Sequence, residues 1–328
     1  MQHWNVLPIR NEQWLCRRSD AGIVPVRPIP RDTPDNEGPA APFAVNEDGW
    51  SALGDGKQLT LLPPNPGQGP VIPALPEDLE SIGALAFHGG ILYVGASSSW
   101  QDTSRLGWID VCEPAPTFHP LPAPNVVGDP HRPIFAILAS HDRLIALDAA
   151  FTPKLAVTYD ISDPRDARCI DHVSIPSGLD DHPVAASLGR SYVAILTNAR
   201  QDRGRAWKIG IFDFDTMDEI ATFYEHADWN KALEMPLGVT MHEDLLLIAR
   251  DMMGVGVVRL DDRKPTRYEH LPVVSPWAQT YVPVDRITYV APLGQGHVTD
   301  VQPTGDPTSF AVTMKRGGRT WWEEIELG

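Results

Sequence analysis

Carboxylates and histidines that could bind a cation occur in the polar segments that separate the apolar runs of this chain. Asp129 and His131 lie in "VVGDPHRP", Asp181 and His182 lie in "GLDDHP", and Asp251 begins "DMMG". Carboxylate oxygens and imidazole nitrogens are ligands for Ca²⁺ or for a transition metal. A water molecule on such a metal can act as a nucleophile. One hypothesis is therefore a metal-dependent hydrolase, similar to a lactonase or a phosphotriesterase, with these residues around the metal.

Tryptophans in the same kind of segment favour protein contact instead. Trp100 lies near Asp102 in "SSSWQDTS", Trp229 follows Asp228 in "HADWNKALEMP", and Trp277 lies in "VVSPWAQ". Tryptophan is enriched at protein interfaces, and carboxylates beside it would steer a basic partner. A third interpretation is that all these side chains are solvated loop residues with no special role.

Three further histidines, His88, His141 and His242, each lie between two apolar runs, in "LAFHGGILYV", "ILASHDRLIAL" and "GVTMHEDLLLIA". A tight hairpin turn accepts polar residues that tolerate positive φ, and histidine is one of these. We therefore expect one structural position that repeats, and no shared metal site. The run "MHEDLL" also lacks the HExxH zinc pattern, because Leu246 stands where the second histidine belongs.

Other catalytic patterns are absent from the sequence. There is no GxSxG nucleophile elbow and no GxGxxG, and "GDGKQLT" has a Gly-Lys pair without the spacing of a P-loop. The basic run "KRGGR", 315–319, is expected to form a hairpin turn. We assign no catalytic residue and predict no cofactor, unless the metal hypothesis holds.

Charge and composition argue against several classes of partner. The chain has 328 residues, with 43 Asp and Glu against 27 Lys and Arg, for a formal net charge of -16. Such a surface repels nucleic-acid phosphates and anionic lipids, and no apolar run is long enough to cross a membrane. The widely spaced Cys16, Cys112 and Cys169 fit reduced thiols. We expect a cytoplasmic protein that binds no nucleic acid, is not inserted in a membrane and has an undetermined oligomeric state.

Short apolar runs bounded by turn residues recur along the chain and predict β-strands. The 32 prolines disfavour long helices. Around residues 88, 141, 188, 242 and 284 the same order appears: a strand, a turn, a more apolar strand, a loop, a third strand and a fourth strand. The interval is about 50 residues, and four antiparallel strands at this spacing are typical of a β-propeller blade.

The number of blades follows from these units. Five of them cover 83–315, and 43–75 forms a weaker sixth. The N-terminal runs "WNVLPI", "QWLCRR" and "GIVPVRPI" supply three strands of another blade, and we predict that the last strand, 320–327, joins it as the fourth and closes the ring. The prediction is a single all-β domain over 1–328, a β-propeller with seven blades preferred and six possible. Pro-rich surface loops are expected at 27–43 and 61–80.

The segment "YDISDPRDARCIDHVSIPSG", 159–178, resembles a known repeat family. Asp160, Ser162, Asp163 and Pro164 match the "DISDP" turn that follows an aliphatic strand in LVIVD-type propeller repeats, and the unit 134–178 resembles one such repeat. The neighbouring units keep the apolar outline with degenerate turns. The resemblance implies a propeller used for interaction, with no fixed chemistry and no catalytic residue to carry over.

In a propeller, the loops between blades share a face with the loops between second and third strands, and ligands tend to bind there. We expect a binding face with these residues on it: Trp100, Asp102, Asp129, His131, Asp181, His182, Asp228, Trp229, Asp251 and Trp277. The predicted function is non-catalytic binding of a macromolecular partner, for example by an acidic inhibitor or immunity-type protein that neutralises a basic protein. The alternative is the metal-dependent hydrolase with its site at the central channel.

Overall fold

The computed structural model describes residues 4–9, 12–19, 22–29, 42–98, 105–122, 134–148, 154–175, 181–201, 204–227, 236–249, 255–260, 281–282, 288–290, 297–306 and 308–326. The chain forms two compact units. Unit 1 comprises Met1–Trp4 and Arg31–Ile175, and unit 2 comprises Asn5–Pro30 and Pro176–Gly328. Unit 2 is therefore assembled from two pieces of chain that are far apart in the sequence.

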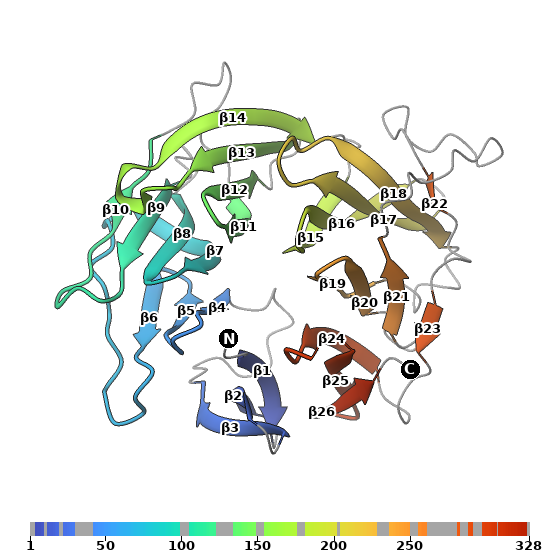
Figure 1. The fold of residues 1–328 in the computed structure, drawn as a ribbon, viewed down its shortest axis with the longest axis horizontal. Coiled ribbons are helices and arrows are strands. Elements are labelled where there is room, and N and C mark those ends of the chain that lie inside the picture. The colour runs from blue at the N-terminus through green and yellow to red at the C-terminus, as the bar shows by residue number, and fades with distance from the viewer. Residues whose placement is uncertain are drawn as a thin grey trace. The chain divides into compact units, whose positions relative to one another are not determined.

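Unit 1 contains three antiparallel sheets (Figure 1). The first is formed by β4 (Phe43–Val45), β5 (Ser51–Asp55) and β6 (Gln58–Leu62). The second is formed by β7 (Leu79–His88), β8 (Ile91–Ser98), β9 (Arg105–Asp110) and β10 (His119–Pro120). The third is formed by β11 (Ile134–Ser140), β12 (Arg143–Asp148), β13 (Lys154–Asp160) and β14 (Arg168–Ile175). Within the described ranges, the one helical element is the 3₁₀ turn η1 (Pro164–Asp166) between β13 and β14.

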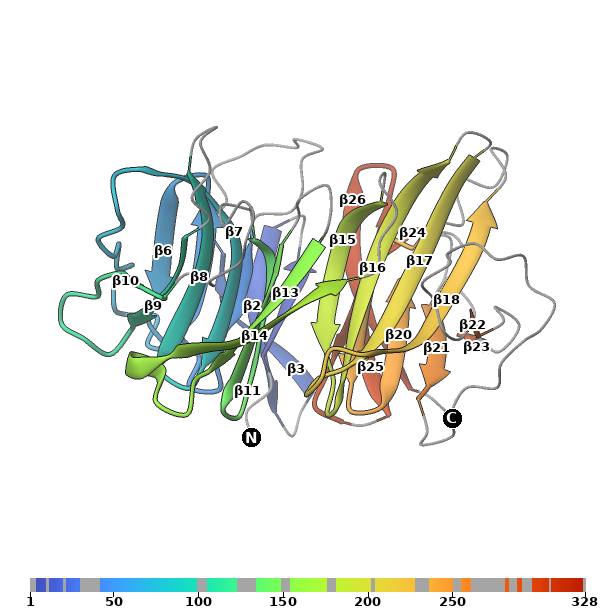
Figure 2. The same ribbon diagram turned by 90° about the horizontal axis from the view of Figure 1, so that it is seen from above.

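Unit 2 contains four sheets. The N-terminal sheet is formed by β1 (Trp4–Ile9), β2 (Glu12–Ser19) and β3 (Gly22–Pro28). A large sheet follows with β15 (Asp181–Leu188), β16 (Tyr192–Gln201), β17 (Gly204–Asp213), β18 (Glu219–Ala227) and the short parallel strand β22 (Tyr281–Val282). The next has β19 (Gly238–His242), β20 (Leu245–Ala249), β21 (Val255–Arg259) and β23 (Thr288–Val290). The C-terminal sheet is formed by β24 (His297–Pro303), β25 (Ser309–Arg316) and β26 (Arg319–Glu326). Figure 2 shows the long strands β15, β16 and β17 running side by side.

The prediction of an all-β chain made of small antiparallel sheets is confirmed, and the described residues form seven sheets. In the three repeat units that begin near residues 83, 134 and 181, the strands follow the predicted order one by one. The order is readable from the sequence there because each first and second strand are joined by a tight turn, which makes the pairing local.

The last two repeat units differ from the prediction. The segment 287–292 was expected to be the second strand of the fifth unit, but its residues 288–290 pair with β21 and thus complete the preceding sheet. The strands predicted as third and fourth in the fifth unit, β24 and β25, are the first and second strands of the C-terminal sheet. The expected fourth strand at 267–273 lies outside the described residues.

The C-terminal strand also pairs differently from the prediction. β26 pairs with β25 along its whole length, and it is not a strand of the N-terminal sheet. The reason is the hairpin at Arg316–Arg319, where Gly317 and Gly318 have φ of 55° and 77°. Two consecutive residues with positive φ form a turn that matches the twist of the flanking strands. The expected turn in "KRGGR" is thus confirmed, and it places β26 beside the strand that precedes it.

The N-terminal and C-terminal sheets pack against each other within unit 2 (Figure 1). Leu7, Cys16 and Ala311 are fully buried between them, and Trp14 and Trp322 pack around these three. Contact between the two ends of the chain was therefore expected correctly, but it is made between two sheets and not inside one.

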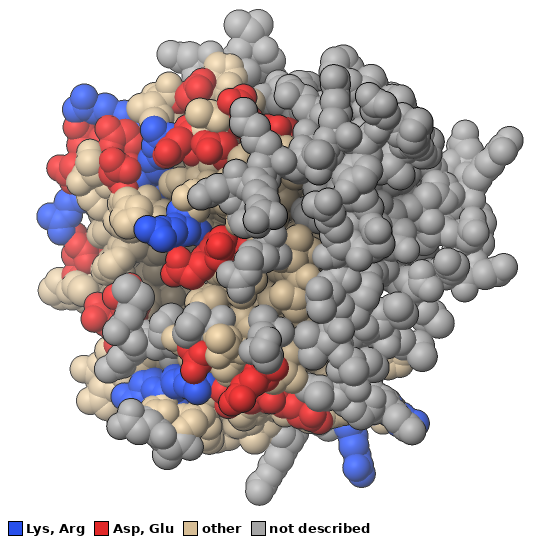
Figure 3. Space-filling view, turned by 45° about the vertical axis from the view of Figure 1, so that its right-hand side comes forward, with Lys and Arg blue, Asp and Glu red and all other residues tan. Residues whose placement is uncertain are grey.

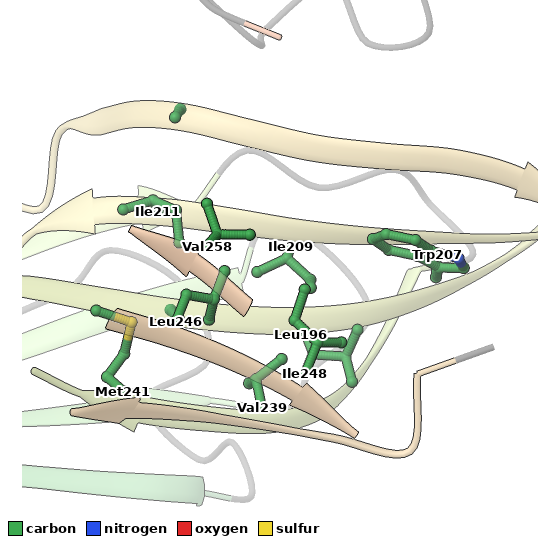
Figure 4. Packing of buried hydrophobic residues seen from close by; sticks show 11 residues of the cluster. Leu196, Trp207, Ile209, Ile211, Val239, Met241, Leu246, Ile248 and Val258 are labelled. Atoms are coloured by element: carbon green, nitrogen blue, oxygen red, sulfur yellow. The ribbon is translucent and has the colours of Figure 1, made fainter. Parts of the chain in front are cut away.

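Alternating side chains of neighbouring sheets form the cores. In unit 2, one core joins β16 and β17 to the sheet of β19–β21, with Leu196, Ile209, Leu246 and Ile248 fully buried and the Trp207 ring at one end of the cluster (Figure 4). Complete burial of an aliphatic side chain stabilises the fold by roughly 1.5–3 kcal/mol. Unit 1 has equivalent cores, of which one includes Tyr93 and Leu144. The period-two pattern of each strand therefore determines which face is buried.

Side chains connect the first strands of neighbouring sheets in unit 2. The backbone N–H of Met241 on β19 donates to Ser187 Oγ on β15 at 2.9 Å. The Thr240 hydroxyl on β19 donates to the carbonyl of Val301 on β24 at 2.7 Å. Gln302 on β24 continues the series to β1, where it bonds both backbone groups of Val6. Four sheets are thus linked through short polar side chains at their first strands.

The second Pro-rich stretch, 61–80, connects β6 to β7. Its residues 64–70 are exposed, and Val71 pairs back onto Leu61 through an isolated bridge. Of the first stretch, 27–43, the described parts are the end of β3 and the start of β4.

Candidate functional site

Most of the predicted binding face lies outside the described residues. This holds for Trp100, Asp102, Asp129, His131, Asp228, Trp229, Asp251 and Trp277. Asp181 and His182 begin β15, where their backbones pair with Ala199 and Asn198, but their side chains are not described. The grouping of these residues, as a protein-binding face or as metal ligands, therefore stays a prediction.

The described part of the chain has neither a cluster of metal-binding side chains nor a helix that could span a membrane. Those residues contain no group of three or more His, Cys, Asp and Glu side chains placed to hold a metal ion. Within the same ranges there is also no helix long and apolar enough to cross a membrane.

The three repeated histidines lie at the hairpins between first and second strands, as predicted, but they do not share one position, and only His141 has the positive φ on which the prediction rested. His88 and His242 are the last residues of β7 and β19, and each pairs across a two-residue turn. His141 lies one position later, inside the turn, with φ of 50°. Gly89 and Glu243 have the equivalent conformation in their own turns, with φ of 55° and 53°. The rings of His242 and Phe310 form a T-shaped pair with 5.9 Å between centroids, so this histidine has a packing role.

The "DISDP" turn is built by local hydrogen bonds. Asp160 Oδ1 accepts from the backbone N–H of Ser162 at 2.9 Å and from its hydroxyl at 2.7 Å. Asp163 Oδ1 accepts from the N–H of Arg165 at 3.0 Å and so caps η1. The backbone and hydroxyl donors of Ser162 lower the pKa of the Asp160 carboxyl. Aspartate is suited to this position because its short side chain reaches backbone donors two residues ahead.

The same device recurs at the end of the third strand in two other sheets. Asp110 Oδ1 accepts from the N–H of Cys112 at 3.0 Å, and Asp213 Oδ1 accepts from the N–H of Asp215 at 2.9 Å. In each sheet the residue after this aspartate donates its N–H to a carbonyl of the first hairpin turn, as Ile161 does to Asp142 at 2.6 Å. The faint repeats that the sequence showed around the clear one thus share a backbone arrangement.

In unit 1 these turns are joined into one surface. Asn46 Nδ2 donates to the carbonyl of Gly89 at 2.8 Å, and the N–H of Val111 donates to the carbonyl of Gly90 at 3.1 Å. Arg165 Nη2 lies 2.7 Å from Asp110 Oδ2, which connects the second sheet to the third. We name this the acidic turn surface, because it carries the following carboxylates: Glu47, Asp48, Asp110, Glu113, Asp142, Asp160, Asp163 and Asp166.

Cations only partly balance the acidic turn surface. Its cationic side chains are Arg143, Arg165 and Arg168. Arg165 pairs with Asp110 and Arg168 with Asp166, and both arginine side chains are largely exposed. The hydrogen bond to Asp110 raises the pKa of Arg165. Glu47, Asp48 and Asp142 are exposed at the tips of their turns. Figure 3 shows one face of the molecule, on which carboxylates and cations lie side by side in several groups.

A half-buried carboxylate in unit 2 was not singled out from the sequence. Asp300 on β24 accepts from Gln302 Nε2 at 2.7 Å and from the N–H of Val301 at 2.9 Å. Burial raises the pKa of this carboxyl against the opposing effect of both hydrogen bonds. Asp300 lies in an ordinary strand pattern, "HVTDVQP", so no local signal marks it. Its two hydrogen-bond partners are the next residues of its own strand, and one of them, Gln302, bonds Val6 near the other end of the chain.

Comparisons with known proteins support the fold without assigning a family. No protein-family model matches the chain. No curated protein matches it either.

Solved structures, in contrast, match over nearly the whole chain. A hypothetical selenium-binding protein from Sulfolobus tokodaii is similar with a TM-score of 0.62 at 9% identity, over 100% of this chain and 87% of that one. The WD40 β-propeller domain of Doa1 has a TM-score of 0.51 at 11% identity, over 99% and 89%. BBS1N, solved in complex with ARL6DN, has a TM-score of 0.53 at 10% identity, over 96% and 88%. The fold of this chain is thus a β-propeller, and identities this low carry no further information about its function.

Proposed function

We propose that this chain is a non-catalytic β-propeller that binds a basic protein partner. The observation that carries the proposal is the acidic turn surface of unit 1, where hydrogen bonds hold together the turns that carry the exposed carboxylates. A preorganised surface of one sign raises the rate at which an oppositely charged protein associates, and it needs little ordering on binding. The net charge of -16 favours the same partner at longer range.

The finer assignments from the sequence belong to this proposal as well. The bonded turn at Asp160, Ser162 and Asp163 supports membership of the LVIVD-type repeat proteins. A cytoplasmic location and a role as an inhibitor of a basic protein are consistent with the acidic charge. The loop residues predicted from the sequence, Trp229 and Trp277 above all, are proposed as a second contact for the same partner.

The decisive experiment compares matched sets of charge changes. The partner is first isolated by capture on the whole protein, and its association rate is then measured at low and high salt. The test variant is Glu47→Gln, Asp48→Asn, Asp142→Asn on the acidic turn surface. The control is Asp55→Asn, Glu77→Gln, Glu80→Gln, which removes as many exposed carboxylates from unit 1 away from these turns.

We expect the test variant to slow association by about tenfold or more at low salt, with a much smaller effect at high salt, since screening removes electrostatic steering. The control variant should change the rate far less. Equal effects of the two variants would contradict the choice of surface. If the double variant Trp229→Ala, Trp277→Ala weakens the binding free energy by roughly 2 kcal/mol and the turn variant has no effect, the contact lies on the loops and not on the turns. If no captured protein binds the chain when both are purified, the proposed binding function is wrong.

A further inference from the structure

The outer strand of the C-terminal sheet, β26, has an edge that no described strand covers. The strand has eight residues and no proline, and it pairs with β25 in an unbroken register. Among the described residues, β25 is its one neighbour in the sheet. An edge of this length is a place where another extended chain can pair, because its outward N–H and C=O groups have no ladder partner.

The outer strands of the other sheets are short, interrupted or covered. β10 has two residues and β23 has three. β3 contains Pro25 and Pro28, and the pairing of β14 shifts register within the strand. β6 is covered by a bridge to Val71, and β18 is covered by β22. Each of these features keeps a sheet edge from pairing with another chain. Of these devices, β26 has none.

The turn before β26 determines which of its backbone groups face outward. The two arginines that flank Gly317–Gly318 are cross-strand partners, and the residues that close a two-residue turn form a hydrogen-bonded pair. Such pairs alternate along an antiparallel ladder. Trp321 and Glu323 therefore direct their backbone N–H and C=O groups toward β25, whereas Trp322 and Glu324 direct theirs away from it.

The charges on β26 select the kind of chain that can pair there. The strand carries Glu323, Glu324 and Glu326, with Arg319 at its start. Glu324 is partly balanced, because it forms an ion pair with Arg18. Within the described ranges, Glu323 and Glu326 form no ion pair. Like charges on neighbouring strands are destabilising, and opposite charges are favourable. A second copy of β26 would bring the carboxylates of both strands together, whereas a basic strand would neutralise them.

Two half-buried tryptophans lie on opposite faces of the same strand. Trp321 packs against the core that contains Phe310, and Trp322 packs against the core that contains Leu7. Trp321 Nε1 donates to Glu323 Oε1 at 3.0 Å, which places an indole ring beside a carboxylate on one face. A lysine or arginine on an added strand can contact such a ring with its aliphatic stem and its cation. The rings thus favour the same basic strand as the carboxylates.

We propose that the edge of β26 binds a basic extended segment of a partner protein, which adds to the C-terminal sheet as a fourth strand. The outward backbone groups of Trp322 and Glu324 supply the hydrogen bonds of the ladder. The carboxylates of Glu323 and Glu326 select the charge of the segment. This edge belongs to unit 2, so the inference does not rest on the function proposed for the acidic turn surface of unit 1.

Amide hydrogen exchange of the wild-type protein tests the proposal with a synthetic peptide. The probe has eight residues that alternate Lys and Val, which matches the length of β26. In the free protein we expect the amides of Trp322 and Glu324 to exchange quickly and those of Trp321 and Glu323 to exchange slowly. The peptide should slow the exchange of Trp322 and Glu324 by about tenfold or more and change the other two far less.

Two control peptides separate strand pairing from simple charge attraction. The first is the same peptide N-methylated at every residue, which keeps the charge and has no N–H to donate. The second replaces each Lys with Glu. We expect neither to protect Trp322 or Glu324. Equal protection by the N-methylated peptide would overturn strand addition, and equal protection by the acidic peptide would overturn the selection of charge.

A matched pair of variants tests which carboxylates matter. Glu323→Gln with Glu326→Gln should weaken binding of the Lys-Val peptide by about tenfold. The control, Glu12→Gln with Asp218→Asn, removes two exposed carboxylates elsewhere in unit 2 and should weaken it far less. Equal effects of the two would contradict a site at β26.

The free protein alone can also refute the proposal. If Trp322 and Glu324 are already as protected as Trp321 without a peptide, the edge is occupied and cannot accept a partner. Protection that rises with protein concentration would identify a second copy as the occupant, contrary to the charge argument. These measurements use the wild-type chain, so they do not depend on the folding of any variant.

Discussion

Arg165 and Asp110 form an ion pair, with 2.7 Å between Nη2 and Oδ2, that joins the turns of two neighbouring sheets in unit 1. The two partners differ in their surroundings, since the Asp110 side chain is 11% exposed and the Arg165 side chain is 65% exposed. Asp110 also accepts from the N–H of Cys112. Asp110 therefore stabilises its own turn through the Cys112 N–H and also contacts the turn of the next sheet through Arg165. The Arg165 side chain contributes only to the contact between the two turns.

Alanine substitutions at this pair should have unequal effects. Asp110→Ala removes the acceptor of a backbone N–H together with the partner of Arg165, and we expect it to lower the free energy of unfolding by about 1–2 kcal/mol. Arg165→Ala should cost clearly less, because an exposed ion pair adds little in water. Chemical denaturation of both variants measures the difference. An Arg165→Ala loss as large as that of Asp110→Ala would show that the ion pair, and not the turn, is the main contribution.

Gly83 on β7 is a site where any side chain should destabilise unit 1. A Cβ atom there would lie 2.4 Å from the carbonyl oxygen of Ile134 on β11, and backbone atoms cannot move aside cheaply. We expect Gly83→Ala to lower the free energy of unfolding by about 1–3 kcal/mol. Gly69→Ala is the control, since nothing lies within 4 Å of a Cβ at that position. Equal melting temperatures for the two variants would contradict the close approach of β7 and β11.

The three cysteines should react with a thiol reagent in the order of their exposure. Cys112 is exposed and should be labelled first. Cys16 is fully buried, and burial raises the pKa of its thiol to about 11, so only about one thousandth of it is ionised at pH 8. Cys16 should be labelled only after unfolding. Mass spectrometry of the labelled peptides measures the order, and early labelling of Cys16 would mean that the N-terminal sheet opens readily.

Metal content separates the proposed binding function from the hydrolase alternative. We expect the natively purified protein to hold well under one equivalent of metal, and chelation with EDTA to leave its melting temperature unchanged. A resident metal would bind the folded protein and stabilise it by mass action. Stoichiometric metal that is lost in Asp181→Ala and Asp251→Ala would establish the metal site in the loops. That outcome would favour the hydrolase.

Much of the central part of the fold could be predicted from local patterns. The strands and hairpins between residues 79 and 249 follow from alternating apolar residues bounded by turn residues. The roles of Asp160 and Asp163 follow from the short reach of an aspartate side chain to backbone N–H groups ahead of it. Each of these features depends on residues within a few positions of one another. The binding face was inferred from the chain order of loops alone, and its residues lie mostly outside the described ranges.

The two ends of the chain were decided by the tertiary structure. Two hydrogen bonds join the backbone of Val6 to the side chain of Gln302, which lies 296 positions away in the sequence. No sequence pattern near either residue predicts this contact. The pairing of Thr288–Val290 with β21 similarly depends on which edge is open after a long connection. Alternation and turn chemistry determine what forms a strand, because they act between sequence neighbours. After a long connection, the partner of a strand is not determined by neighbouring residues. It depends on the entropy of closing the loop and on which sheet edge or side chain the packed core leaves accessible.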